Sequence, residues 1–110
     1  VIVMSISSPA FANGLSGACM SKGITYGNPN KIGAKTQTST DKYRFEDGKV
    51  FHSWEGRDEY EYGPVTETQH PNSYTSGLMR FVFTSDQGGY ATHADNIGWK
   101  VIHLDCAISR

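Results

Sequence analysis

The chain has 110 residues, which is enough for one domain but not for two. Its formal net charge is -1 and its Lys and Arg residues are scattered, which excludes the basic face that nucleic-acid binding requires. The 12 glycines, the many aromatic residues and the short apolar runs between turn residues are typical of an all-β domain.

The first twelve residues have the pattern of an export signal. Residues 1–8 are apolar, and Ala10, Phe11 and Ala12 follow as a small-residue cleavage site. We therefore predict that residues 1–12 are a signal peptide remnant, that residues 13–110 form a single β-domain, and that this domain is periplasmic or extracellular. The alternative is a short N-terminal strand. The apolar run is too short to span a bilayer.

Two cysteines bracket the expected domain. An even number of cysteines in a small exported chain favours a disulfide between Cys19 and Cys106. Such a bond would close almost the whole domain and add up to about 4 kcal/mol in the chain-entropy model. Lipidation of Cys19 is disfavoured, because Leu15 stands one position too far upstream.

The segment before the first hairpin carries weak signals. Residues 13–20 are small and Gly-rich and predict an irregular lead-in, and residues 22–27 predict a short first strand. Residues 28–41 contain Pro and Gly without any periodicity, which indicates a long loop.

The strongest local pattern is a hairpin over residues 42–54. Asp47 and Gly48 lie between two apolar runs, and a type I′ turn at this dipeptide fixes the register. That register places Glu46 opposite Lys49, Phe45 opposite Val50 and Tyr43 opposite His52. One face of the hairpin is then apolar, and it consists of Tyr43, Phe45, Val50, His52 and Trp54.

The second half of the chain alternates short strands and turns. We expect a strand over residues 57–68 with Tyr60 and Tyr62 on one face, and a loop over residues 69–76. Further strands are expected over residues 78–84, 90–94 and 99–106, with a turn at 95–98. The inward side chains should be Met79, Phe81, Phe83, Ile102, Leu104 and Cys106.

These six or seven strands predict a fold class. Neighbouring strands that are joined by tight turns pair with each other, and a sheet of this size buries its apolar face and removes its edges by curling shut. The prediction is an all-β, small antiparallel up-and-down β-barrel. The alternative is a two-sheet β-sandwich.

The candidate ligand-binding residues lie on the apolar face of the hairpin. His52 is a polar group among aromatic side chains, with Tyr43 opposite it and Trp54 two residues further on. It is either a hydrogen-bonded core residue or the group that orients a ligand in the barrel.

A metal site is the alternative. His93 and Asp95 share a strand face and His103 lies on the next strand, so these three residues could hold a divalent ion. No compact ligand motif supports the site, and we expect neither a metal nor a cofactor.

The sequence thus favours an exported, non-enzymatic binding domain. Its partner would be a small apolar ligand inside the barrel, or another protein that is recognised by the loops 28–41 and 69–76 at the rim. No nucleophile elbow, phosphate-binding loop or dinucleotide fingerprint argues for catalysis. The alternatives are a metal-dependent envelope enzyme that uses His93, Asp95 and His103, and a structural envelope component.

Overall fold

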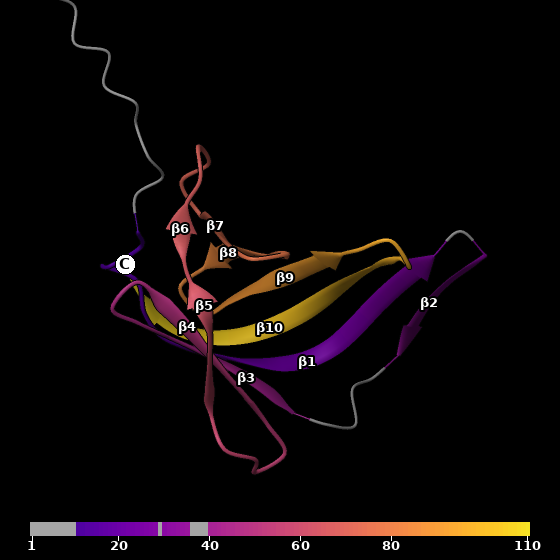
Figure 1. Cartoon of the computed structure of the whole chain (residues 1–110), viewed down its shortest axis with the longest axis horizontal. Coiled ribbons are helices and arrows are strands. Elements are labelled where there is room, and N and C mark those ends of the chain that lie inside the picture. The colour runs from indigo at the N-terminus through magenta and orange to yellow at the C-terminus, as the bar shows by residue number, and fades with distance from the viewer. Residues whose placement is uncertain (1–10, 29, 36–39) are drawn as a thin grey trace, which may run out of the picture.

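The computed structural model describes residues 11–28, 30–35 and 40–110, and every regular element in them is a β-strand (Figure 1). The described residues contain no helix that is long and apolar enough to cross a membrane. The strands are β1 (Ser16–Asn28), β2 (Lys31–Lys35), β3 (Asp41–Glu46), β4 (Lys49–Trp54), β5 (Tyr60–Pro64), β6 (Thr66–Glu67), β7 (Ser73–Ser76), β8 (Met79–Ser85), β9 (Gly88–Ala94) and β10 (Trp99–Ser109).

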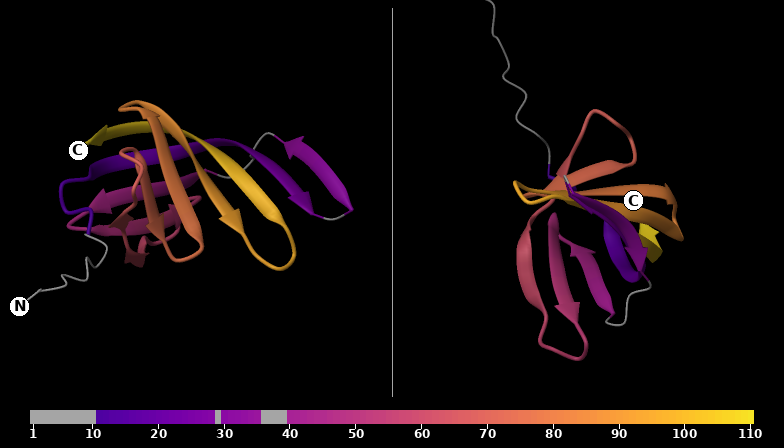
Figure 2. Two further views of the ribbon diagram at one scale, coloured as in Figure 1. Left: turned by 90° about the horizontal axis from the view of Figure 1, so that it is seen from above. Right: turned by 90° about the vertical axis from the view of Figure 1, so that its right-hand side faces the viewer.

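The strands form one antiparallel sheet that curls into a nearly closed barrel (Figure 2), which confirms the predicted fold class. Its order is β5-β4-β3-β1-β10-β9-β8-β7-β6, and β2 pairs with the far end of β1. The first strand therefore lies between β3 and the last strand. Residues Gly17 to Met20 of β1 pair with β3, and Ile24 to Asn28 pair with β2.

Several strand boundaries differ from the sequence-based prediction, among them the start of β9, at Gly88 rather than residue 90, and the end of β10, at Ser109 rather than residue 106. β1 starts at Ser16 rather than after an irregular lead-in, β2 lies within the expected loop 28–41, and β7 occupies the end of the expected loop 69–76. The lead-in was misread because its small residues serve close backbone packing. A Cβ atom on Gly17, whose φ is +112°, would lie 2.1 Å from the carbonyl oxygen of Ala107 on β10. Residues 29 and 36–39 of the expected loop, and residues 1–10, lie outside the described residues.

The expected strand over residues 57–68 is broken into β5 and β6. Pro64 is the last residue of β5, and the N–H of Val65 donates to the carbonyl of Gly48 in the turn between β3 and β4 (2.8 Å). The proline lies in a strand at one end of the sheet order, where the lack of an N–H is tolerated. A second irregularity shifts the register between Val50 and Phe51.

The central hairpin has the predicted register, with Glu46 opposite Lys49, Phe45 opposite Val50 and Tyr43 opposite His52. Asp47 and Gly48 have φ angles of 52° and 73°, as a type I′ turn requires. Four residues of the hairpin's apolar face are buried in the barrel, namely Tyr43, Phe45, Val50 and His52, whereas Trp54 at the end of β4 is 42% exposed, so the prediction that it also faces the interior is wrong.

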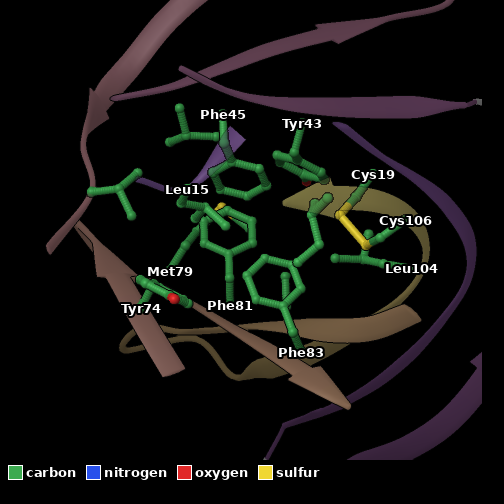
Figure 3. Close-up of a cluster of buried hydrophobic side chains, with 14 of the residues drawn as sticks. Leu15, Cys19, Tyr43, Phe45, Tyr74, Met79, Phe81, Phe83, Leu104 and Cys106 are labelled. Carbon is green, nitrogen blue, oxygen red and sulfur yellow. A yellow bond between two sulfur atoms is a disulfide. The ribbon is translucent and has the colours of Figure 1, made fainter. Parts of the chain in front are cut away.

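The barrel interior is filled by aromatic side chains (Figure 3). The rings of Phe45 and Phe81 meet edge to face with centroids 5.1 Å apart, and Phe45 meets Phe83 in the same way at 5.7 Å. These three side chains are at most 2% exposed. The expected inward residues of β8 and β10 are all buried, which confirms their predicted orientation: Met79, Phe81, Phe83, Ile102, Leu104 and Cys106.

The two cysteines lie opposite each other on β1 and β10. Their Cα atoms are 4.0 Å apart and their sulfur atoms are at bonding distance, as the sequence predicts. The disulfide faces the core beside Leu104 (Figure 3). The disulfide links β1 to β10, the first and last strands along the chain, which are neighbours in the sheet.

The residues just before β1 seal one side of the barrel. Ala12 and Leu15 are buried, the N–H of Ala12 donates to the carbonyl of Val65 (2.9 Å), and Phe11 forms a β-bridge with Thr66. Cleavage after Ala12, as the signal-peptide hypothesis requires, would remove Phe11 and Ala12 and with them the hydrogen bond to Val65 and the bridge to Thr66.

Candidate functional site

The side chain of His52 lies at the centre of a hydrogen-bonded chain. Its Nε2 lies 3.1 Å from a carboxylate oxygen of Asp41, and its Nδ1 lies 2.7 Å from the hydroxyl of Tyr60. A carboxylate only accepts hydrogen bonds, so the neutral imidazole carries its proton on Nε2 and accepts the Tyr60 hydroxyl proton at Nδ1. A protonated imidazole would keep both partners, because Nδ1 would then donate to the same hydroxyl.

Aromatic rings surround this chain. The Tyr43 ring stacks on His52 with centroids 5.0 Å apart, and the rings of Trp54 and Tyr60 meet His52 edge-on. Burial, with the Asp41 charge as the next cause, raises the pKa of Tyr43, so its hydroxyl stays protonated at neutral pH. The three predicted ligand-binding residues, His52, Tyr43 and Trp54, are thus brought together in one cluster.

This cluster satisfies its own polar groups. His52 is only 8% exposed and uses both ring nitrogens within the protein. These hydrogen bonds satisfy the polar groups of a residue that lies on an apolar face. The phenol of Tyr60 is half exposed and forms the accessible end of the chain.

The structure does not bring the alternative metal ligands together. His93 pairs with Lys100 and His103 pairs with Tyr90, so the two imidazoles leave opposite faces of the sheet. The Nε2 of His103 lies 3.2 Å from the hydroxyl of Thr25 on β1. Within the ranges that the structure covers, no three His, Cys, Asp or Glu side chains are grouped so that they could hold a metal ion.

A different surface lies where β1–β2 and β9–β10 extend past the barrel, at the end opposite the C-terminus (Figures 1 and 2). We call it the distal tip, and it comprises residues 26–28, 31–32 and 93–100. Its turn is ordered by Asp95, whose Oδ1 accepts the N–H groups of Ile97 (2.8 Å) and Gly98 (3.1 Å). These hydrogen bonds hold the pKa of Asp95 below its ordinary value.

Two adjoining hollows, of about 260 and 380 Å³, lie on the distal tip. Asn28, Asp95, Ile97, Gly98 and Trp99 line both hollows. The first hollow is also lined by Tyr26, His93 and Lys100, and the second by Ala94 and Asn96.

The indole of Trp99 is held in place by a glycine. Trp99 pairs with Gly27, and a Cβ atom on that glycine would lie 2.5 Å from the indole Cζ2. The ring therefore occupies the space above Gly27, while 42% of the residue remains exposed. Ile32, which pairs with Gly27 from the other side, is 76% exposed.

Three residues of these sites do not stand out in the sequence. The sequence pattern places Asp41 at the end of a loop, Tyr60 on a half-buried strand face and Trp99 only at the start of the last strand. Their roles depend on pairing between strands. The register of the central hairpin was the one available signal, because it places residue 41 opposite Trp54 and therefore beside His52.

Comparison with protein-family models, curated proteins and solved structures finds no match to this chain.

Proposed function

We propose that this chain is an exported, non-enzymatic binding domain that recognises its partner through the distal tip. The observation that carries the proposal is a contrast in burial. The barrel interior is filled by Phe45, Phe81 and Phe83, whereas Trp99, Ile97 and Ile32 are exposed together at the tip. Large apolar side chains gathered on a surface are characteristic of interaction sites.

The same contrast argues against an apolar ligand enclosed in the barrel. A ligand among the core phenylalanines would have to displace side chains that pack edge to face. The polar group that was expected to orient such a ligand, His52, already has a partner at each ring nitrogen. Recognition at an exposed surface requires neither rearrangement.

Export is part of the proposal. It is supported by the small-residue site at Ala10 to Ala12 and by the Cys19–Cys106 pair, since disulfides persist in oxidising compartments. Sequencing the N-terminus of the secreted product checks this part. A start at Asn13 supports it, and an unprocessed cytoplasmic product contradicts it.

The chain has two tryptophans, one in each candidate site, which makes the binding proposal testable. Trp54→Phe leaves Trp99 as the only indole, and Trp99→Phe leaves Trp54 beside His52. Both variants are screened by fluorescence and thermal shift against lipids, small aromatics, sugars and divalent metals. A ligand at 100-fold excess over its Kd should add about 2.7 kcal/mol of stability.

We expect at least one ligand in the screen to change the fluorescence emission of the Trp54→Phe variant, in which Trp99 is the only indole. The same ligand should leave the emission of the Trp99→Phe variant unchanged. A ligand sensed only by Trp54, and lost in His52→Ala, would move the site to the aromatic cluster. Stabilisation by a metal that disappears in the His93→Ala/His103→Ala double variant would favour the metal-dependent alternative instead.

A further inference from the structure

We infer that the distal tip is a saccharide-binding site, in which Trp99 is the stacking platform for one pyranose ring. The inference rests on the proposed function and specifies its ligand class. It is carried by three features of the tip: a fixed and partly exposed indole, the amide and carboxylate groups of residues that line the same hollows, and the shape of these hollows.

The indole is pre-organised for stacking. Gly27 leaves room for the ring on the neighbouring strand, and any side chain at that position would collide with it. An aromatic ring that is already fixed loses little conformational entropy when a ligand binds. The apolar C–H face of a pyranose is flat and matches such a ring in size and in polarity.

The polar groups at the tip suit neighbouring hydroxyl groups. Asn96 offers an amide with two donors and an acceptor, Asn28 offers the two donors of its amide, whose oxygen accepts the N–H of Asn30 (2.8 Å), and Asp95 offers a carboxylate. The turn N–H groups of Ile97 and Gly98 bind Oδ1 of Asp95 and fix the orientation of the carboxylate. Among the described residues, the other oxygen of Asp95 has no hydrogen-bond partner, so it can accept from a sugar hydroxyl.

The hollows argue against other ligand classes. They are shallow surface hollows that mix polar and apolar side chains, whereas a lipid chain requires a deeper apolar cavity. Lys100 is the one cation that lines them, and Asp95 lines both, so an anionic ligand would meet a carboxylate in either hollow. A neutral saccharide fits this combination best.

The test uses the full chain in the Trp54→Phe background, so that Trp99 is the only indole. The probes are glucose, galactose, mannose and N-acetylglucosamine and their oligomers, together with a glycoprotein and its deglycosylated form. We expect saturable quenching of Trp99 by at least one oligosaccharide. Binding to the free oligosaccharide and to the glycoprotein, but not to the deglycosylated protein, would show that the tip recognises the glycan itself, whether it is free or attached to a protein.

The variants separate stacking from folding. Trp99→Ala in the wild-type background should weaken the affinity for the oligosaccharide, measured by calorimetry, at least tenfold. Trp99→Phe should weaken this affinity less, and Asp95→Asn should also lower it. Unchanged unfolding midpoints verify that these variants are folded. Trp54→Phe is the matched aromatic control and should bind like the wild type.

Three results would overturn the inference. A saccharide that binds Trp99→Ala as tightly as the wild type would place the site elsewhere. Binding of another ligand class at Trp99, with no response to any saccharide, would overturn the ligand class and leave the proposed function standing. Ligands that act only through Trp54 and His52 would overturn both.

Discussion

The barrel and the distal tip share the strands β1, β9 and β10, but large side chains are buried in the barrel and exposed at the tip. Along β10, the inward side chains of Ile102 and Leu104 are at most 2% exposed, whereas Trp99, at the start of the same strand, is 42% exposed. The side chains alternate between the two faces in both regions. Because Trp99 is an odd number of residues away from Ile102 and Leu104, its side chain lies on the outer face of β10, which points away from the barrel interior.

The change occurs within one cross-strand row on the inner face. Inside the barrel, the row is Ile24, Ile102 and Ala91, and all three are apolar. The next row towards the tip is Tyr26, Lys100 and His93, which can face water. The sequence thus marks where packing ends, and large groups beyond this point are available for recognition rather than for stability.

The largest effect is expected in the barrel. Phe81→Ala removes a ring that is 0% exposed and that contacts the rings of both Phe45 and Tyr43. Loss of the buried ring and the cavity it leaves should lower the free energy of unfolding by about 4 kcal/mol. Urea denaturation measures this effect. A loss below about 1 kcal/mol would mean that the interior is not packed as described.

The disulfide should rank second. Replacing both cysteines by alanine removes a link between residues 87 positions apart, and it should destabilise the domain by about 3 kcal/mol. Intact mass with and without reductant should differ by two hydrogens, and the oxidised form should have no thiol that can be alkylated. Two reactive thiols in the native, unreduced protein would contradict the pairing.

The central turn should rank third. Gly48 has a φ of 73°, and a Cβ atom there would lie 2.6 Å from the side-chain oxygen of Asn13. Gly48→Val should therefore cost at least about 1 kcal/mol, because a β-branched residue avoids positive φ. Gly56, which also has positive φ but has open space around its Cβ position, is the control for the steric part. An unchanged denaturation midpoint for Gly48→Val would exclude a type I′ turn.

The sequence predicts those strand pairings that depend on local contacts and does not predict those that depend on distant ones. The hairpin around Asp47 and Gly48 was predictable to the residue, because a two-residue turn fixes the register. The pair Cys19–Cys106 also indicated which strands meet. However, the register shifts by one between Ser21 and Gly23, and without this irregularity Tyr26 rather than Gly27 would lie opposite Trp99.

The aromatic cluster was predictable only in part for the same reason. The face shared by Tyr43, His52 and Trp54 follows from alternation along one hairpin. Tyr60 reaches His52 through a register shift in the β4–β5 pair, which no local pattern announces. Buried residues on neighbouring strands were therefore predictable, and the partners of the polar group among them were not.

The tip should tolerate what the barrel does not. Trp99→Ala should change the free energy of unfolding by less than about 1 kcal/mol, because the ring lies on the surface and no second layer covers it. The comparison with Phe81→Ala, also a loss of one aromatic ring, measures the difference between the two regions directly. Equal losses for the two variants would show that the tip belongs to the core.

The smallest effect is expected at the turn of the tip, and it depends on pH. The N–H groups of Ile97 and Gly98 lower the pKa of Asp95 below its ordinary value of 3.8, since they stabilise the charged carboxylate. Because the pKa of Asp95 is lower in the folded state than in the unfolded state, the charged carboxylate stabilises the turn at pH values above the ordinary pKa. This stabilisation is lost as the pH falls through the pKa of the folded state. The amides of Ile97 and Gly98 should therefore lose protection from hydrogen exchange in that acidic range, while the amides of the core strands stay protected. The Asp95→Asn variant, which has no carboxylate at this position, is the reference and should not show this pH-dependent loss. An NMR titration midpoint for Asp95 at or above 3.8 would show that the carboxylate does not order the turn, and the tip would then lack the fixed acceptor that separates it from an ordinary exposed hairpin.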